Sequence, residues 1–290
     1  MKFRVFVSRL GEEEVSKVRE QAVKLENSSE QSSPRNIPYI CTLVNPHLFH
    51  TYIHQRRLKD KHVVAFGGDG FYLNPQNKLS AHFILGLTDV SNPKVCFIPT
   101  AGGDTPAYME AFVARYSPDL CEATQLKLFN REIKDLRSYL LSQNVIYVGG
   151  GNTANMLAIW RVHGVDEILR EAYEAGVVMC GTSAGSLCWF ECGVTDSFGL
   201  DLAPINDGLG FIKGSNCPHY DSEALRQPQY QKFIREGLAS GYAADDGAAL
   251  HFVNGTFAEA ISSKPASRAF HLEMKDGEVV QTRLDVRYLG

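Results

Sequence analysis

The sequence has no long hydrophobic run and no surplus of one charge, and each absence excludes a class of protein. No stretch approaches the roughly 18 apolar residues of a membrane-spanning helix. The charged start Met1-Lys2-Phe3-Arg4 is unlike a signal peptide, which needs an apolar segment. The 29 Lys and Arg residues and 33 Asp and Glu residues give a net charge of −4. We therefore expect no nucleic-acid partner and no attachment to a membrane.

The sequence also lacks any paired Cys-x-x-Cys spacing. Its seven cysteines are odd in number, and several, such as Cys96 and Cys180, lie inside apolar runs. An odd number of cysteines in a long chain does not suggest a disulfide framework, and a cysteine zinc site would need paired spacings, so free buried thiols in a reducing, cytoplasmic setting are expected. The set His47, His50 and His54 fits one helix face, but no nearby carboxylate completes a metal site. We expect neither a metal nor another cofactor.

Composition divides the chain near residue 60. Residues 1–60 include a charged run and then the polar stretch Asn-Ser-Ser-Glu-Gln-Ser-Ser-Pro at 27–34, which is typical of a linker. This extension is given no role. From residue 61 onward, short apolar runs end in glycine or proline, which indicates one folded domain over 61–290. These runs lie at 63–66, 95–98, 145–148 and 177–180.

Strand and helix patterns alternate after residue 60. Continuous apolar strands are typical of a sheet buried on both faces, and helical patterns between them predict parallel βαβ units. The helical patterns lie at 105–116, 131–141, 153–160 and 164–175. Beyond residue 247 strand patterns follow one another, at 249–253, 258–262, 268–274 and 278–284, with Asn254-Gly255 and Asp276-Gly277 as hairpin turns. The expected fold is α/β: a doubly wound, mostly parallel sheet flanked by helices, closed by C-terminal antiparallel strands.

Residues 181–185, Gly-Thr-Ser-Ala-Gly, directly follow the strand pattern at 177–180 and precede a helical pattern. This G-x-S-x-G spacing between a strand and a helix is typical of a nucleophilic serine, because small flanking residues allow the sharp turn that exposes the hydroxyl. Ser183 is therefore the predicted nucleophile. The amide of Ala184, at the start of the following helix, is a predicted oxyanion donor. The alternative is a tight turn in which Ser183 is an ordinary helix N-cap.

A serine nucleophile needs a base within hydrogen-bond reach. Among nine histidines, His219 is the predicted base, because residues 214–221 read as a polar loop that opens a helical segment, and catalytic groups often lie on such loops. The imidazole needs an acceptor in turn. Asp246, just ahead of a strand pattern, and Asp196, soon after the helix of Ser183, are both candidates. Either could equally be an ordinary turn aspartate.

A second glycine-rich strand end, Gly-Gly-Gly-Asn-Thr, occupies residues 149–153. Consecutive glycines let backbone amides face a developing negative charge, so the amide of Gly151 is the predicted partner of Ala184 in an oxyanion hole. Taken alone, the same glycines also fit a phosphate cradle or a simple tight turn. Asn152, beside them, is a candidate for substrate binding.

The order of four motifs, at 149–153, 181–185, 218–219 and 246–247, resembles that of the peptidase E (aspartyl dipeptidase) and cyanophycinase family of serine peptidases, peptidase family S51. The upstream Phe-Ile-Pro-Thr-Ala-Gly-Gly-Asp at 97–104 is similar as well. The resemblance spans about residues 61–255. It implies a fold like the class I glutamine amidotransferase core and makes 61–290 a serine peptidase catalytic domain.

The resemblance also implies roles for single residues. Ser183 would be the nucleophile and His219 the base, with Asp246 or Asp196 completing a triad. The expected activity is that of a metal-independent exopeptidase or dipeptidase, which cleaves small peptides after an N-terminal aspartate. Such selectivity implies a cation facing the substrate carboxylate, and Arg226, on the helix after His219, is the candidate; the alternative is an ordinary surface arginine.

Two other functions stay open at this point. An α/β-hydrolase-type esterase shares the G-x-S-x-G motif, but in that fold the acid precedes a distant histidine. Here His219 soon follows Ser183, and order favours the peptidase if Asp246 is the acid; with Asp196 it would not discriminate. A non-catalytic α/β module that binds a small metabolite at the glycine loops would need no nucleophile. A homo-oligomer is compatible with the sequence.

Overall fold

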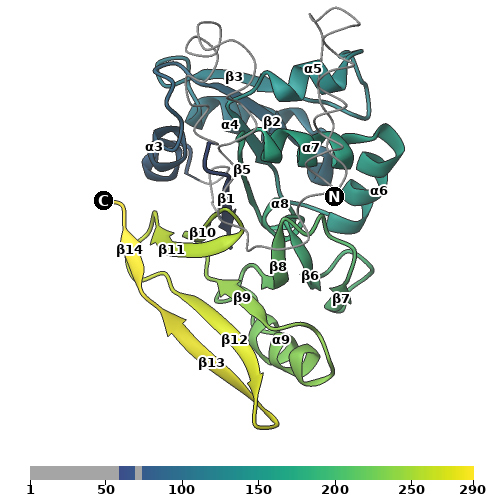
Figure 1. Ribbon diagram of the computed structural model, residues 1–290, viewed down its shortest axis with the longest axis vertical. Helices are drawn as coiled ribbons and strands as arrows, with labels where there is room; N and C mark the ends of the chain where they lie inside the picture. Colours follow the sequence, from purple (N-terminus) through teal and green to yellow (C-terminus); the bar gives the residue numbers. More distant parts are fainter. Residues whose placement is uncertain (1–58, 69–73) are drawn as a thin grey trace, which may run out of the picture. The chain divides into compact units, whose positions relative to one another are not determined.

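The computed structural model describes residues 59–68 and 74–290, which belong to one compact unit, Leu58–Gly290 (Figure 1). Apart from Lys59 and Asp60, the predicted extension lies outside the described residues, and so do His47, His50 and His54. The boundary near residue 60 and the linker character of the extension stay predictions.

The larger of two sheets has eight strands in the order β14-β11-β10-β1-β5-β4-β2-β3. Neighbours from β1 to β3 in this order are parallel, whereas β10 and β11 add antiparallel pairs and β14 is parallel to β11. The bounds are β1 (His62–Phe66), β2 (Lys94–Ile98), β3 (Glu122–Gln125), β4 (Val145–Val148), β5 (Val178–Thr182), β10 (Ala248–Val253), β11 (Thr256–Ser262) and β14 (Val286–Tyr288). The predicted α/β fold with a mostly parallel sheet is confirmed.

Helices cover both faces of this sheet. In β1, Val63 and Ala65 enter one apolar layer, while Val64 and Phe66 enter the other. This explains why the strands are apolar throughout instead of alternating. The layer of Phe66 is closed by α3 (Leu79–Gly86) and α4 (Pro106–Arg115), and the layer of Val63 by α5 (Leu136–Leu141), α6 (Thr153–His163), α7 (Val165–Glu174) and α8 (Ala184–Leu187). The predicted helices are all present, although α5 starts later than its pattern indicated.

Two C-terminal hairpins form at the predicted turns. Asn254 and Gly255 have φ values of 53° and 80°, and Asp276 and Gly277 have 51° and 86°. Positive φ at both central residues defines a type I′ turn, which suits the twist of paired strands. The first turn joins β10 to β11. The second joins β12 (Ala269–Lys275) to β13 (Glu278–Leu284).

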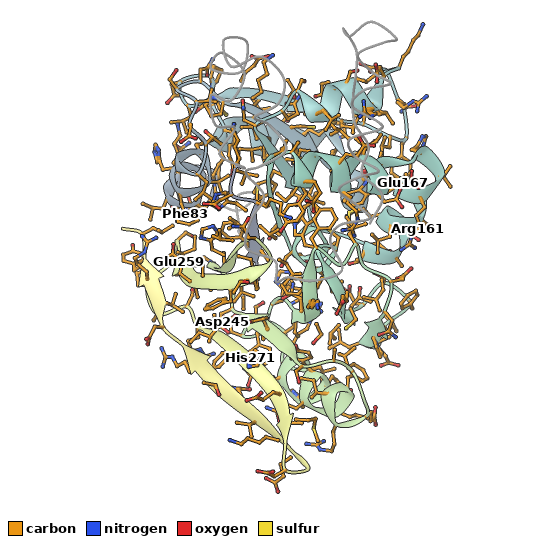
Figure 2. All side chains as sticks on the ribbon, viewed as in Figure 1. Phe83, Arg161, Glu167, Asp245, Glu259 and His271 are labelled. Carbon is orange, nitrogen blue, oxygen red and sulfur yellow. The ribbon has the colours of Figure 1, made fainter. Side chains whose placement is uncertain are left out.

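The sequence patterns did not predict a second sheet of six strands, in the order β13-β12-β9-β8-β6-β7. Its remaining members are β6 (Phe190–Thr195), β7 (Ala203–Ile205), β8 (Ile212–Cys217) and β9 (Gly241–Ala244). Residues 214–217 therefore belong to a strand and not to the expected loop, and β12 and β13 join this sheet instead of closing the larger one. Helix α9 (Arg226–Arg235) packs on it, and Asp245 follows β9 where the chain crosses to the larger sheet (Figure 2).

Six of the seven cysteines lie in the described residues, and all six are buried free thiols, as predicted. Burial raises the pKa of Cys96 and of Cys217 to about 12, so both thiols stay protonated at neutral pH.

No helix in the described part of the chain has the length and apolarity to cross a membrane. Residues 59–68 and 74–290 also contain no group of three or more His, Cys, Asp or Glu side chains arranged to hold a metal ion.

Candidate active site

The carboxyl-terminal edge of the parallel sheet brings the predicted motifs together. Gly150 follows β4, Ser183 follows β5 and Gly68 follows β1, and these three strands are neighbours. The amide of Ser183 donates to the carbonyl of Phe66 at 3.2 Å, which ties the ends of β5 and β1. Ligand sites in open parallel sheets form at this edge.

Ser183 has the backbone of a nucleophile elbow. Its φ of 56° and ψ of −116° lie in a region that costs a non-glycine residue about 1–3 kcal/mol and that concentrates at functional sites. The residue is half-buried, and although it occupies the N-cap position of α8, its side chain makes no capping hydrogen bond. The strain therefore is not explained by the alternative of an ordinary N-cap.

The flanking glycines of this elbow are required by the approach of β4. A Cβ on Gly181 would lie 2.7 Å from the Val148 carbonyl oxygen, and one on Gly185 would lie 2.1 Å from the same atom. The helix that follows, α8, spans four residues, so it is shorter than the sequence suggested and adds little dipole. What remains at the site is the individual amide of Ala184.

His219 and Asp246 form a direct pair. The distance from His219 Nδ1 to Asp246 Oδ1 is 2.7 Å, and the two side chains are 23% and 30% exposed. Burial raises the pKa of Asp246, but the hydrogen bond and charge of His219, together with smaller effects of Ser222 and Lys264, outweigh it, so the pKa of Asp246 lies below its usual value. Folding therefore favours the ionised carboxylate. The stability that this adds is present above about pH 4 and is lost as the pH falls through the folded-state pKa.

Two residues that the sequence reasoning did not single out fix the backbone of Asp246. Asp221 Oδ1 accepts the Asp246 amide at 2.8 Å, and Ser267 Oγ donates to the Asp246 carbonyl at 2.7 Å. Asp221 lies two residues beyond His219, so one short loop carries the histidine and anchors its acceptor. Only the neighbouring motif at 218–219 gave a hint of this in the sequence.

Gly68, just beyond β1, lies against the His219–Asp246 pair and bridges to Asp246 through the backbone. Its Cβ, if present, would lie 2.2 Å from Asp246 Oδ1 and 3.0 Å from His219 Cε1. Asp246 precedes β10 and Ser183 follows β5, and these two strands flank β1. The imidazole therefore lies beside Gly68, just beyond the end of β1, the strand that neighbours β5.

Replacing Gly68 by alanine should therefore lower turnover without unfolding the protein. The methyl group would displace Asp246 and His219, and a misplacement of about 1 Å can cost on the order of 100-fold in rate. Peptidase kinetics together with circular dichroism would measure both effects. The matched control is Gly86→Ala, since nothing lies within 4 Å of a Cβ at that position; equal activity of the two variants would contradict the predicted crowding.

Almost all backbone amides of the glycine-rich loop after β4 donate a hydrogen bond within the protein. Gly149 donates to Ile98, Gly150 to the Tyr108 hydroxyl, Asn152 to Ala101, Thr153 and Ala154 to Ser197 Oγ, and Asn155 to Asn152 Oδ1. Within the described residues, Gly151 is the member of this run for which no acceptor is present. Its φ of 134° and the carbonyl of Ala101, 2.1 Å from where a Cβ would be, make glycine necessary there.

Asn152 and Asp196 lie on two loops that hydrogen bonds to Ser197 hold together. Asn152 Oδ1 caps α6, and its Nδ2 donates to the Ser197 carbonyl at 3.0 Å, so both ends of this side chain are engaged in holding loops together. Asp196 is exposed, beside Ser197. The structure thus brings Asp246, and not Asp196, into contact with His219. A direct contact of Asn152 with substrate stays a prediction.

Arg226 is the site candidate whose placement differs most from expectation. It is 3% exposed at the first position of α9. Its Nε pairs with Glu223 at 2.6 Å, and its Nη1 donates to the Val194 carbonyl at 2.9 Å. Its charge is therefore paired with Glu223, and its hydrogen bond to Val194 joins α9 to β6. This placement does not favour the predicted contact with a substrate carboxylate.

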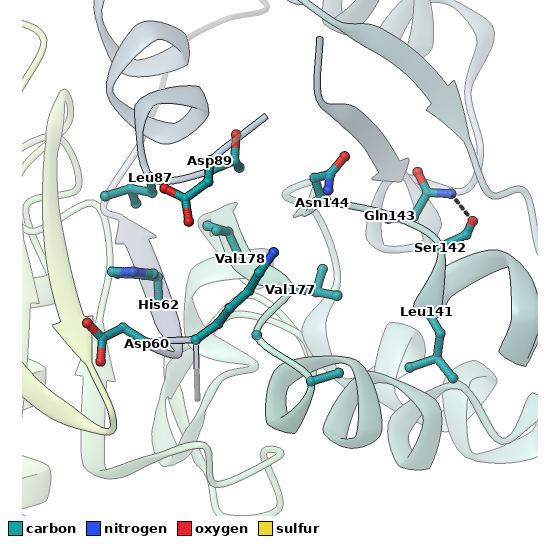
Figure 3. Close-up of a pocket in the computed structure, with 14 residues that line it drawn as sticks. Asp60, His62, Leu87, Asp89, Leu141, Ser142, Gln143, Asn144, Val177 and Val178 are labelled. Carbon is teal, nitrogen blue, oxygen red and sulfur yellow. Dashed lines mark hydrogen bonds between the residues drawn. The ribbon is translucent and has the colours of Figure 1, made fainter. Parts of the chain in front are cut away.

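A pocket of about 380 Å³ lies at the opposite edge of the larger sheet, around the strand starts near His62, Asn144 and Val178 (Figure 3). Its lining mixes Lys59 with Asp60 and contains none of the predicted catalytic residues. Because the elbow and the histidine pair lie at the carboxyl-terminal edge, this pocket is not the site of the predicted chemistry.

Comparison with known proteins agrees with this geometry. Residues 63–260 match the model of Peptidase family S51. The uncharacterized peptidase YgaJ of Bacillus subtilis (strain 168) is 45% identical over 231 residues, which cover 79% of this chain and 100% of that protein. Peptidase E of Haemophilus influenzae is 27% identical over 179 residues, 58% of this chain and 81% of that protein.

A solved structure has the same fold. The crystal structure of a peptidase from an acI-B1 Actinobacterium matches with a TM-score of 0.58 over 79% of this chain and 96% of that chain, at 16% sequence identity. The family match extends over most of the described domain. The chain therefore belongs to peptidase family S51, and it is a serine-type peptidase, as the ordered motifs of its sequence indicated.

Proposed function

We propose that this peptidase is an exopeptidase or dipeptidase that cleaves after an N-terminal aspartate, through a triad of Ser183, His219 and Asp246. The observation that carries the proposal is the 2.7 Å hydrogen bond between His219 and Asp246, at the sheet edge where the strained Ser183 elbow also lies. The preference for aspartate comes from the resemblance to peptidase E.

The mechanism begins with the tautomer of His219. Nδ1–H donates to Asp246, which leaves the Nε2 lone pair to take the Ser183 hydroxyl proton as Oγ attacks the carbonyl carbon. The developing oxyanion accepts the amides of Gly151 and Ala184. This role is supported because neighbouring amides already have acceptors, that of Gly150 in Tyr108 and that of Ser183 in Phe66.

The second half returns each group to its starting state. The imidazolium gives its proton to the departing amine, and the C–N bond breaks to leave an acyl ester on Ser183. His219 then takes a proton from water, whose oxygen attacks the ester carbonyl. The imidazolium gives this proton to Ser183 Oγ as the ester C–O bond breaks, which releases the acid. The Ser183 hydroxyl is restored in the same step, so no net proton remains on the enzyme.

The order of the residues favours this mechanism over that of an α/β-hydrolase esterase. In that fold the acid precedes a distant histidine, whereas Asp246, the residue that touches His219, follows it. A non-catalytic metabolite-binding module has no need of an elbow strained at its serine. The small-peptide substrate, the lack of a nucleic-acid or membrane partner, a homo-oligomeric state and a cytoplasmic location stay predictions.

A substrate panel tests the proposal. The purified full chain is assayed with Asp-Leu, its near-isostere Asn-Leu, N-acetyl-Asp-Leu and p-nitrophenyl acetate, without added metal. We expect Asp-Leu to have a kcat/KM higher than that of Asn-Leu by at least roughly tenfold, with no cleavage of the acetylated peptide. Ester hydrolysis without dipeptide cleavage would instead indicate an esterase, and equal rates for Asp-Leu and Asn-Leu would remove the preference for aspartate.

A further inference from the structure

Tyr108 contacts the glycine loop that carries Gly151. Its hydroxyl accepts the Gly150 amide at 2.7 Å. The ring lies against the same loop, since a Cβ on Gly149 would lie 2.7 Å from Tyr108 Cε1. It also lies against the 3₁₀ turn Thr100–Gly102 that follows β2, because a Cβ on Gly102 would lie 3.1 Å from Tyr108 Cδ1. The tyrosine thus lies between the loops that follow two neighbouring strands, β2 and β4.

The ring itself is held by the core. Tyr108 lies in the first turn of α4 and packs edge-on against Phe97, with ring centroids 5.2 Å apart and planes at 81°. Phe97 is fully buried in β2 and stacks in turn on Phe112 of α4. The hydroxyl is therefore carried by a rigid group rather than by a mobile surface side chain.

Gly150 connects this tyrosine to the nucleophile. On one side its amide is bound by Tyr108, and on the other its Cβ position lies 3.1 Å from Ser183 Cβ and 3.6 Å from Ser183 Oγ. The next residue, Gly151, has no side chain to restrain it, and its amide is the one left without an acceptor in this run of the described chain. A shift of Gly150 would rotate that amide directly.

We infer that Tyr108 is a positioning residue of the peptidase: its hydroxyl fixes the Gly150 peptide and so aims the Gly151 amide at the oxyanion. This inference rests on the proposed function, since it assigns Gly151 to the oxyanion hole. Tyr108 does not need to touch the substrate. Its contribution is specific to the transition state, because the amide it aims binds charge that develops only there.

The test replaces Tyr108 by phenylalanine, which keeps the ring and removes the hydroxyl. Loss of a complete oxyanion donor costs about 100–1,000-fold in kcat, so a misaimed donor is expected to lower kcat by roughly 10–100-fold, with KM within about twofold of the wild-type value. The control is Tyr139→Phe, which loses a hydrogen bond of the same length, 2.7 Å, to Thr124 away from the site. Assays are run where circular dichroism shows each variant folded.

Two ligands separate positioning from a general structural effect. The first ligand is the aldehyde that corresponds to the acyl residue of the best dipeptide. Ser183 Oγ adds to its carbonyl carbon and forms a hemiacetal whose oxygen lies where the oxyanion would. The second ligand is a dipeptide in which CH2–NH replaces the amide, and it cannot form an oxyanion. Tyr108→Phe should weaken the aldehyde by the same factor as kcat and leave the reduced dipeptide unchanged. Equal weakening of both ligands, or a kcat within twofold of wild type, would overturn the inference.

The Ser183→Ala variant shows whether a negative result concerns only the role of Tyr108 or the proposed function as a whole. If Ser183→Ala is inactive and Tyr108→Phe is fully active, only the role of Tyr108 is wrong. If Ser183→Ala keeps its activity, the proposed mechanism fails, and with it the assignment of Gly151. A fall in kcat shared equally by Tyr139→Phe would also count against Tyr108, since that residue lies outside the site.

Discussion

The Ser183→Ala variant is expected to lose on the order of 10⁶-fold in turnover while keeping its fold. Loss of a serine nucleophile has an effect of this size in serine peptidases because the remaining triad members cannot act without it. Removing the side chain also leaves the φ of 56° in place, so stability should change little. Steady-state rates on the best dipeptide and a thermal melt measure the two quantities.

The matched control for this variant is Ser142→Ala. Ser142 is an exposed serine that lines the pocket at the opposite edge of the sheet. Its hydroxyl donates to the Tyr139 carbonyl and accepts from Gln143 Nε2, both away from the site. It should keep wild-type kcat. A Ser183→Ala protein that hydrolyses dipeptides at near-normal rates would rule out the acyl-enzyme mechanism.

Replacing Asp246 by asparagine is expected to lower kcat on the order of 10⁴-fold, the effect of the equivalent change in a serine protease triad. Asparagine retains the shape of the side chain. It no longer supplies the carboxylate that accepts from His219 Nδ1 at 2.7 Å, so the imidazole is no longer held with its lone pair on Nε2. The measurement is kcat on the best dipeptide, with KM expected to change much less.

Asp196→Asn is the comparison that decides between the two acids. Asp196 is exposed and Asp246 is bonded to His219, so Asp196→Asn should retain activity within a few-fold of wild type, a change that corresponds to less than about 1.4 kcal/mol. The opposite ranking of the two variants would assign the orienting role to Asp196.

In the wild-type protein the lowered pKa of Asp246 keeps its carboxylate ionised at neutral and mildly acidic pH, so its protonation should not limit activity there.

The larger sheet could be predicted from the sequence because its physical constraints are local. Strands buried on both faces must be apolar throughout, as at 145–148, and I′ hairpins need residues that tolerate positive φ, as at Asn254-Gly255. The smaller sheet gave no such signal. β8, Ile212–Cys217, has the sequence Ile-Lys-Gly-Ser-Asn-Cys, whose polar residues read as a loop although Ser215 and Asn216 are buried and hydrogen-bonded in the fold.

In the candidate site, too, some features could be predicted from the sequence and others could not. Motifs carried by consecutive residues, such as the elbow at Ser183, could be predicted because the turn itself demands small residues. Contacts between distant segments could not be, since nothing in the sequence links Tyr108 to Gly150 or Ser197 to Asn152. Arg226 shows the limit most clearly: its residue type suits a carboxylate ligand, and only the fold reveals that its guanidinium is turned inward to Glu223 and Val194.

The most direct measurement is the mass of the protein after reaction with a serine-directed fluorophosphonate, followed by mapping of the labelled peptide. An activated Ser183 should take up one phosphonyl group, on the peptide that contains residues 181–185, with no label on Ser183→Ala and strongly slowed labelling of His219→Gln. Label on another residue, or equal labelling of wild type and Ser183→Ala, would contradict the assignment of Ser183 as the nucleophile that His219 activates.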